Sequence, residues 1–182
     1  MTKIETVKKT ARQYFDTEDW QYHVLKVVFY ARQLAKKHKA DNTVIELAAY
    51  LHDIARSKEA HDKEDHHIVG AKMAQKILTK NGFRKSVIDQ VTHCIEAHRC
   101  KKDFQPKTIE AKIIANADAM SHFDIMPIFY FWRSKKYSAD EITTWITEKL
   151  QRDWESKLTL PGAKQLVQKK YHAIKLLLQS LS

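Results

Sequence analysis

The chain has few of the residues that build turns and cross-links. Only three glycines and three prolines occur in 182 residues, and an all-β protein with many short strands would need more of both in its turns. The two cysteines, Cys94 and Cys100, are too few for a disulfide framework, which is typical of a reducing compartment. No apolar run is long enough to cross a bilayer. We therefore predict an all-α protein of the cytoplasm without a membrane-spanning segment.

Length and charge set the scale of the fold and the kind of partner. With 43% hydrophobic residues, the chain can form one sizeable core but not two independent ones. We predict a single domain over residues 1–182, with a motif-bearing core at 1–124 and a helical extension at 125–182 packed on it. The formal net charge of +10 favours anionic partners. Because the lysines occur in scattered dyads, we favour solvated helix faces, and binding to nucleic acid is the less favoured alternative.

Apolar residues recur at helical spacing along most of the chain. Capping signals at Thr2, at Asp41–Thr43 and at Ser138 begin helices, and Asn81-Gly82 ends one. A charged stretch at 56–65 predicts a loop, and the aromatic run 128–132 after Pro127 predicts a short core segment. We expect helices over about 3–15, 16–39, 43–55, 66–80, 87–98, 108–123 and 139–158, and from 161 onward.

A histidine and an aspartate stand side by side near the end of the third expected helix, at His52 and Asp53, in an otherwise apolar run. Helical side chains lean back over the preceding turn, where the small residues Ala48 and Ala49 leave room for an ion. Buried polar groups need partners, and a divalent cation suits both a neutral imidazole and a carboxylate. We therefore expect this pair to bind a metal ion.

Two further side chains share this apolar setting. His23 lies on the apolar side of the second expected helix, and Asp118 is flanked by alanines inside the sixth. An unpaired carboxylate would be costly there, so Asp118 should meet a cation or strong hydrogen-bond donors. A set of two imidazoles and two carboxylates suits Mn, Fe, Co, Ni or Zn better than Ca, with open positions for water and substrate.

The ordered pattern of His23, then Leu51-His52-Asp53, then Asn116-Ala117-Asp118 resembles the HD-domain phosphohydrolase superfamily, and in particular its small stand-alone bacterial members. Neighbouring segments are similar too, so the resemblance covers about the first two-thirds of the chain. It implies an HD-like helical bundle in which a divalent ion, with Mn, Fe, Co, Ni, Mg or Zn left open, is bound by four ligands: His23, His52, Asp53 and Asp118. After Asp124 nothing specific resembles the family.

The resemblance also implies an activity, the hydrolysis of a phosphomonoester or phosphodiester, often of a nucleotide, with His52 and Asp53 at the catalytic centre. A bound metal ion would polarise a phosphoryl oxygen and lower the pKa of a bound water. His67 and His98 match positions that contact substrate or a second metal in some members. Basic residues near the ligand helices in sequence are candidate phosphate contacts: Lys26, Arg56 and Lys112.

Other interpretations stay open for several residues. We favour a partly exposed position at a helix start for His66, while His122 is either a partner of Asp118 or an ordinary core or surface residue. Asn116 stands where an acidic residue is expected in related proteins, which changes the charge beside the expected ligand. The alternative function is a non-catalytic binding or regulatory module that keeps the HD scaffold and senses a nucleotide or a partner protein.

Overall fold

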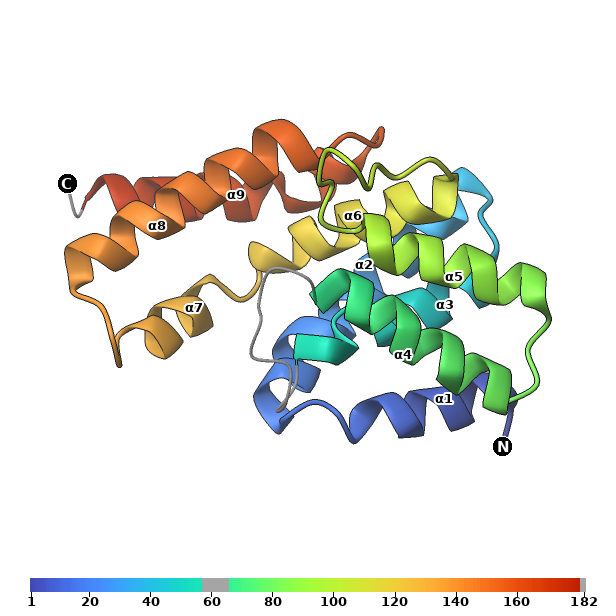
Figure 1. Cartoon of the computed structure of the whole chain (residues 1–182). Coiled ribbons are helices and arrows are strands. Elements are labelled where there is room, and N and C mark those ends of the chain that lie inside the picture. The colour runs from blue at the N-terminus through green and yellow to red at the C-terminus, as the bar shows by residue number, and fades with distance from the viewer. Residues whose placement is uncertain (57–65, 181–182) are drawn as a thin grey trace.

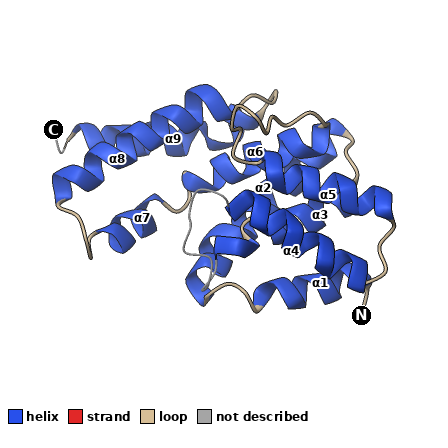
Figure 2. Ribbon diagram, viewed as in Figure 1, coloured by secondary structure: helices blue, strands red, loops and turns tan. Residues whose placement is uncertain are grey.

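The computed structural model of the chain describes residues 1–56 and 66–180. These residues form helices and connecting turns and contain no strand (Figure 2), which confirms the all-α prediction. The helices lie in two groups that meet at α6 (Ile109–His122), and the two ends of the chain lie at opposite ends of the molecule (Figure 1). No helix among the described residues is long and apolar enough to cross a membrane.

The first group is a bundle around α3 (Asn42–Leu51). Seven of the ten residues of this helix are buried, because it is apolar on nearly all sides and has to lie inside the protein. It packs against helices on several sides: α1 (Lys3–Arg12), α2 (Leu25–His38), α5 (Lys85–Ala97) and α6. The outer helix α4 (His66–Lys80) covers α5 and the short 3₁₀ turn η2 (Ile54–Arg56).

The second group holds the C-terminal helices. They are α7 (Met126–Arg133), α8 (Ala139–Arg152), the π-helical turn η3 (Asp153–Lys157) and α9 (Ala163–Gln179). Both η3 and α9 pack against α6, in which every residue from Ile113 to His122 is buried. Helix α6 therefore belongs to the cores of both groups.

Side-chain contacts hold α9 in place. The rings of Trp154 and Tyr171 stack with centroids 4.1 Å apart and join η3 to α9. The ammonium group of the preceding residue, Lys170, pairs with Asp124 and donates a hydrogen bond to the hydroxyl of Tyr30 on α2. The last helix is thus tied to its own group and to the first group.

Some expected boundaries were wrong for local reasons. The first helix ends at Arg12 rather than near Phe15, because the guanidinium group of Arg12 donates to the carbonyl oxygen of Phe15 and stabilises a turn. The third helix ends at Leu51, so the His52-Asp53 pair lies in a turn before η2. The aromatic run forms helix α7 with Pro127 in its first turn, where proline is tolerated. The loop expected at 56–65 lies outside the described residues except for Arg56, which ends η2.

Two long helices expected from the periodicity contain π-helical segments. The second begins with η1 (Asp19–Val24), where the N–H of Leu25 bonds to the carbonyl of Trp20, and the seventh passes into η3, where Leu158 bonds to Asp153 at 3.1 Å. A π-helical turn has a wider hydrogen-bond spacing than an α-helix and often marks a functional site. It therefore changes the face on which the following side chains lie, which a search for the 3.6-residue period cannot detect.

The central position of α3 predicts a large difference between two leucine substitutions. Leu47 is fully buried on α3, so Leu47→Ala should lower the free energy of unfolding by about 2–5 kcal/mol. Leu177 is 67% exposed on α9, so Leu177→Ala should change it by less than about 0.5 kcal/mol. Urea unfolding followed by circular dichroism measures both values, and equal losses would contradict this position of α3.

Candidate metal centre

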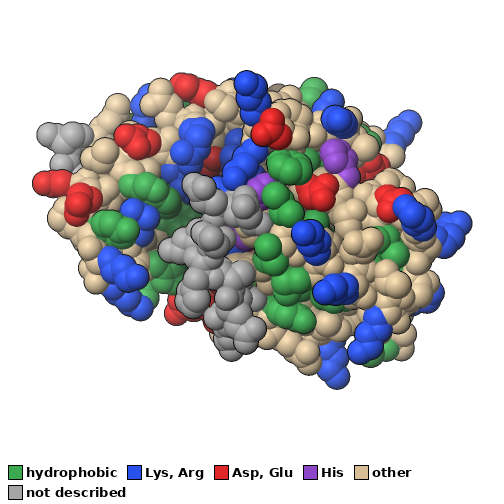
Figure 3. Space-filling model, viewed as in Figure 1, with side chains coloured by type: hydrophobic (Ala, Val, Ile, Leu, Met, Phe, Trp, Pro, Cys, Tyr) green, Lys and Arg blue, Asp and Glu red, His purple; other side chains and the backbone are tan. Residues whose placement is uncertain are grey.

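The His52-Asp53 turn is surrounded by polar side chains from four other parts of the bundle. All of them are at most 8% exposed, and histidine and basic side chains are visible together near the centre of one face (Figure 3). Most come from regions far apart in the sequence: His23 from η1, His66 from α4, His98 from the end of α5, and Asp118 and His122 from α6. A dense cluster of imidazoles and carboxylates therefore lies inside an otherwise apolar core.

A first group of ligand atoms consists of His23, His52 and Asp118, whose potential metal-binding atoms all lie within 4.8 Å of one another. The Nε2 atoms of His23 and His52 are 3.1 Å apart. The Oδ1 atom of Asp118 lies 3.6 Å from Nε2 of His23, and Oδ2 of Asp53 lies 3.3 Å from the same nitrogen. The four side chains expected to bind one metal ion therefore lie in one cluster: His23, His52, Asp53 and Asp118.

The outward hydrogen bonds of these imidazoles decide which nitrogen carries the proton. Nδ1 of His52 lies 3.0 Å from the carbonyl oxygen of Ala49, so Nδ1–H is the donor. The hydroxyl of Ser121 donates to the carbonyl of Asp118 and accepts from Nδ1–H of His23 at 3.0 Å. In the neutral form of each imidazole, Nε2 therefore carries the lone pair and faces the cluster, as in metal-ligating histidines.

A second group of ligand atoms consists of Asp53, His66 and His98. The Oδ1 atom of Asp53 is buried, accepts no hydrogen bond from the described residues, and lies 3.3 Å from Nε2 of His66 and 3.4 Å from Nε2 of His98. Nδ1 of His98 is turned outward to the carbonyl of Ile95 at 2.6 Å. Oδ2 of Asp53 thus lies beside the first group of ligand atoms, and Oδ1 belongs to the second group.

The expectation that His66 is partly exposed was wrong, since His66 is 8% exposed.

The electrostatics of the cluster favour the protonation states that bind metals. Burial raises the pKa of Asp53, but nearby Arg56 and His52 outweigh this effect and hold that pKa well below its ordinary value. Asp118 is also ionised, because His122 and Lys157 lower its pKa more than burial raises it. Burial lowers the pKa of His52 to about 4. At neutral pH the site therefore contains carboxylates beside a neutral imidazole, which is the combination that metal binding requires.

The C-terminal helices contribute three charged groups that sequence reasoning did not assign, and some of them reach Asp118 through His122 of α6, which was considered as a partner of Asp118. Nε2 of His122 lies 3.4 Å from Oδ1 of Asp118, and its Nδ1 lies 2.8 Å from Oδ2 of Asp153 and 3.0 Å from Nζ of Lys149. Nζ of Lys157 lies 3.7 Å from Oδ2 of Asp118. A sequence signal for this set exists: charged residues recur every four positions from the last turn of α8 onward, at Lys149, Asp153 and Lys157.

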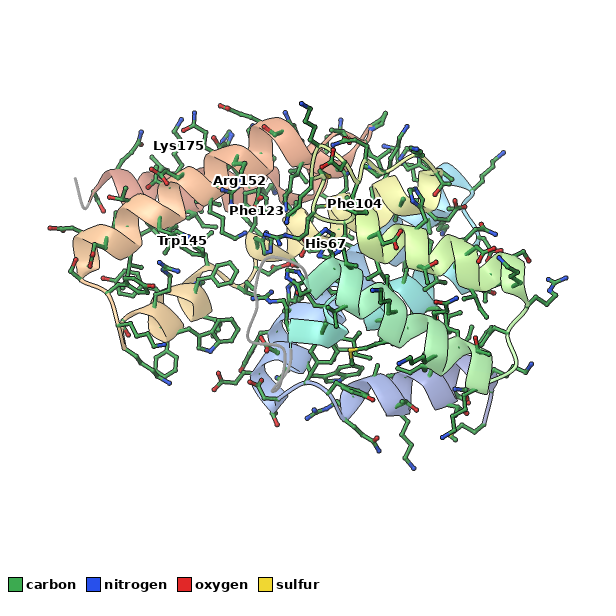
Figure 4. All side chains as sticks on the ribbon, viewed as in Figure 1. His67, Phe104, Phe123, Trp145, Arg152 and Lys175 are labelled. Atoms are coloured by element: carbon green, nitrogen blue, oxygen red, sulfur yellow. The ribbon has the colours of Figure 1, made fainter. Side chains whose placement is uncertain are left out.

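The remaining predicted site residues have different surroundings. Arg56 pairs with Oδ2 of Asp53 at 2.8 Å, with its own side chain about half exposed. His67 is fully buried next to Phe104 (Figure 4), its ring nitrogens have no hydrogen-bond partner among the described residues, and burial lowers its pKa to about 4. Lys26 is half-buried and Lys112 is exposed. Among the described lysines and arginines, Arg56 lies within ion-pair distance of Asp53 and Lys157 within ion-pair distance of Asp118. Neither Lys26 nor Lys112 pairs with these two carboxylates in the described part of the chain.

Asn116 has a structural partner in the C-terminal part of the chain. Its amide nitrogen donates to the hydroxyl of Thr159 at 3.2 Å, and its amide oxygen accepts from the N–H of Leu160 at 3.1 Å. An ionised carboxylate could accept such bonds but could not donate one. Asparagine at this position therefore fastens the segment that follows η3 to helix α6.

Comparison with known proteins identifies the family. The sequence model of the HD domain matches residues 20–122, which is more than half of the 182 residues. The chain belongs to the HD domain family. This confirms the resemblance seen in the sequence, and the matched region contains the HD pair at His52 and Asp53 together with His23 and Asp118.

Similar proteins extend the comparison to the rest of the chain. Ribonuclease Y from Thermoanaerobacter pseudethanolicus is 32% identical over 120 residues, which cover 64% of this HD protein and 22% of ribonuclease Y. The crystal structure of YpgQ from Bacillus subtilis in complex with ADP has a TM-score of 0.78 at 19% identity and covers 98% of this chain and 93% of YpgQ. A predicted HD superfamily hydrolase from an uncultured Thermotogales bacterium has a TM-score of 0.59 at 25% identity, with 81% and 89% covered. The likeness to YpgQ shows a shared helical fold that includes the C-terminal helices.

The buried pairing of Asp153 predicts a large effect of its removal. Asp153→Ala leaves the buried ammonium of Lys149 without its carboxylate, which should lower the free energy of unfolding by about 3–5 kcal/mol. Glu148→Ala removes an exposed carboxylate one residue from Lys149 and should have little effect. Urea unfolding at neutral pH compares the two variants, and a loss for Asp153→Ala as small as for Glu148→Ala would contradict the pairing.

The same pairing predicts a dependence on pH. Burial raises the pKa of Asp153, but the neighbouring imidazole and two ammonium groups outweigh burial and hold that pKa below its ordinary value. A carboxylate with a lowered pKa in the folded protein stabilises it above the unfolded pKa of about 4, and this contribution is lost as the pH falls further. The difference in unfolding free energy between the unaltered protein and Asp153→Ala should therefore shrink on acidification below about pH 4.

Proposed function

We propose that this HD protein is a metal-dependent phosphohydrolase that cleaves a phosphomonoester or phosphodiester bond of a nucleotide or another small phosphorylated compound. The observation that carries the proposal is the convergence of Nε2 of His23 and Nε2 of His52, 3.1 Å apart, beside two buried carboxylates. Imidazole nitrogens and ionised carboxylates gathered in a buried site are stabilised by a cation among them. A divalent metal ion supplies that cation.

We propose that each group of ligand atoms holds one ion. The ligands would be His23, His52, Asp53 and Asp118 for the first ion, and Asp53, His66 and His98 for the second. Mixed imidazole and carboxylate ligands fit Mn, Fe, Co, Ni, Zn or Mg, and the identity of the metal stays open. The chemistry that bound ions supply is polarisation of a phosphoryl oxygen and activation of water for attack on phosphorus.

The protein contributes orientation and charge to this reaction. The hydrogen bonds from His52 to Ala49 and from His23 to Ser121 hold the imidazole rings in one orientation. The guanidinium of Arg56 is about half exposed beside Asp53, where its planar set of donors suits the oxygens of a phosphate group. His67 is a further proposed substrate contact, since its ring nitrogens have no hydrogen-bond partner in the described part of the chain.

The similar proteins support a nucleotide as substrate. YpgQ binds ADP in its crystal structure, and the name ribonuclease Y refers to cleavage of RNA. This chain matches only 22% of ribonuclease Y, so we propose a small nucleotide rather than RNA. We also propose that residues 1–182 act as a single domain in the cytoplasm, because Asp153 and Lys157 face the HD site and the two cysteines are free.

The central test is the substitution Asp53→Asn, which keeps the size of the side chain but removes its charge. We expect phosphoester hydrolysis to fall by more than about a hundredfold, because both groups of ligand atoms lose a carboxylate oxygen. Activity is measured with Mn²⁺, Co²⁺ or Mg²⁺ on a panel of nucleoside mono-, di- and triphosphates, cyclic nucleotides and aryl phosphodiesters. Asp89→Asn is the matched control, since it changes an exposed carboxylate on α5 that pairs with Lys85.

Some outcomes of this assay would contradict the proposal. A metal-loaded protein that binds nucleotides saturably but hydrolyses no compound of the panel would instead be the non-catalytic module with an HD scaffold. Asp89→Asn should retain full activity. Equal activity of Asp53→Asn and the unaltered protein would show that the carboxylate of Asp53 is not needed for the reaction.

The second group of ligand atoms gives a separate prediction. His66→Ala removes an imidazole 3.3 Å from Oδ1 of Asp53, so the number of tightly bound Mn²⁺ ions should fall from two per chain to one. His172→Ala, an exposed histidine on α9, should leave the number unchanged. Equilibrium dialysis with metal analysis measures both. Retention of two ions by His66→Ala would exclude His66 as a ligand.

A further inference from the structure

Two lysines of the C-terminal helices reach the candidate metal centre but differ in how they are bonded. Nζ of Lys149 lies 3.0 Å from Nδ1 of His122 and 3.2 Å from Oδ2 of Asp153, so it is held by close polar contacts. Nζ of Lys157 lies 3.7 Å from Oδ2 of Asp118 and 3.8 Å from Oδ1 of Asp153. Both of the latter distances exceed those of a hydrogen bond. Lys157 is therefore held by charge alone.

An ammonium group has three hydrogen-bond donors, and withdrawing it from water is costly when the donors find no acceptor. The side chain of Lys157 is only 16% exposed, yet no described residue accepts a hydrogen bond from it. The neighbouring Oδ1 of Asp153 is buried and likewise has no hydrogen-bond partner among the described residues. The donors of Lys157 are thus available to a ligand that enters beside Asp118.

The backbone that carries Lys157 is fixed from both sides. The π-helical turn η3 ends with the bond from Leu158 to Asp153, and the amide of Asn116 then binds Thr159 and Leu160. The stacked rings of Trp154 and Tyr171 hold the opposite side of the turn against α9. A residue held this firmly is suited to orient a ligand, because little freedom is left to lose on binding.

The charges around Lys157 indicate the class of ligand. Among the described residues, three buried carboxylates at the site pair with three cations: Asp53, Asp118 and Asp153 with Arg56, Lys149 and Lys157. Each divalent ion at the ligand groups would add two positive charges to this balanced set. An anion with two or more negative charges, such as a phosphate group, offsets this added positive charge.

We propose that Lys157 binds a phosphate oxygen of the substrate, so that the C-terminal helices supply a substrate-binding residue to the HD site. The inference rests on the proposed function, because the metal centre determines which anion enters. Lys149, Asp153 and Asn116 are positioning residues in this arrangement. The region after residue 124, in which the sequence shows no motif, thereby takes part in recognition.

The test measures binding of inorganic phosphate to the Mn²⁺-loaded protein by isothermal titration calorimetry. Lys157→Met should weaken phosphate affinity about tenfold or more, since a charged donor to the phosphate is lost, while Mn²⁺ content stays that of the unaltered protein. Lys157→Arg, which keeps a charged donor, should retain most of the affinity. Lys169→Met removes an exposed lysine of α9 and should change neither quantity.

Two results would overturn the proposal. Unchanged phosphate affinity in Lys157→Met would show that the ammonium serves only the ion pairs within the protein. Loss of Mn²⁺ together with phosphate would show that Lys157 acts through Asp118 on the metal. Lys157→Gln decides the same question if Lys157→Met does not fold, because its neutral amide keeps a hydrogen-bonding group near Asp153 without the charge.

The assay separates this inference from the proposed function because phosphate binding needs no turnover. A protein that hydrolyses no phosphoester but binds phosphate through Lys157 would refute the phosphohydrolase and retain the binding site. If the unaltered protein hydrolyses phosphoesters but Lys157→Met binds phosphate with unchanged affinity, the phosphohydrolase is retained and phosphate binding through Lys157 is refuted.

Discussion

The Nε2 atoms of His23 and His52 meet at 3.1 Å inside the core, and the rest of the site is arranged around this contact. The contact brings together two potential metal-binding atoms beside the carboxylates of Asp53 and Asp118. In water such groups would separate and be solvated, but here the packing of α3 and α6 keeps them together. Because water is largely excluded, each charge interacts more strongly with its neighbours than it would at the surface.

The two groups of helices have different tasks at this site. The first group contributes the potential metal-binding atoms, and its outward hydrogen bonds to backbone and hydroxyl groups fix the imidazole orientations. The C-terminal group contributes charges that reach Asp118 directly or through His122. Helix α6 contacts both groups and carries both Asp118 and His122. A change of charge in the C-terminal helices would therefore alter the electrostatic environment of Asp118.

The sequence predicted the fold class and part of the cluster well, for identifiable reasons. The scarcity of glycine and proline and the helical spacing of apolar residues indicated an all-α bundle. The HD pair was recognisable because two polar residues directly follow the apolar run of α3, and Asp118 stood out because it is flanked by alanines. His66 was misassigned because it begins a helix after a charged stretch, where an exposed position is the ordinary expectation. The π-helical turns were missed because their spacing departs from the 3.6-residue period.

What the sequence by itself determined is local: which segments are helical, which faces are apolar and which polar residues lie in apolar surroundings. Only the tertiary structure decided which of those polar residues meet. His23 contacts residues 29 and 98 positions away, and His122 contacts one 31 positions away. Such distances are set by how whole helices pack, and packing depends on the shapes of many side chains at once rather than on any short pattern. The division of the Asp53 oxygens between two sets of histidines, and the place of Lys157 beside Asp118, follow from that packing.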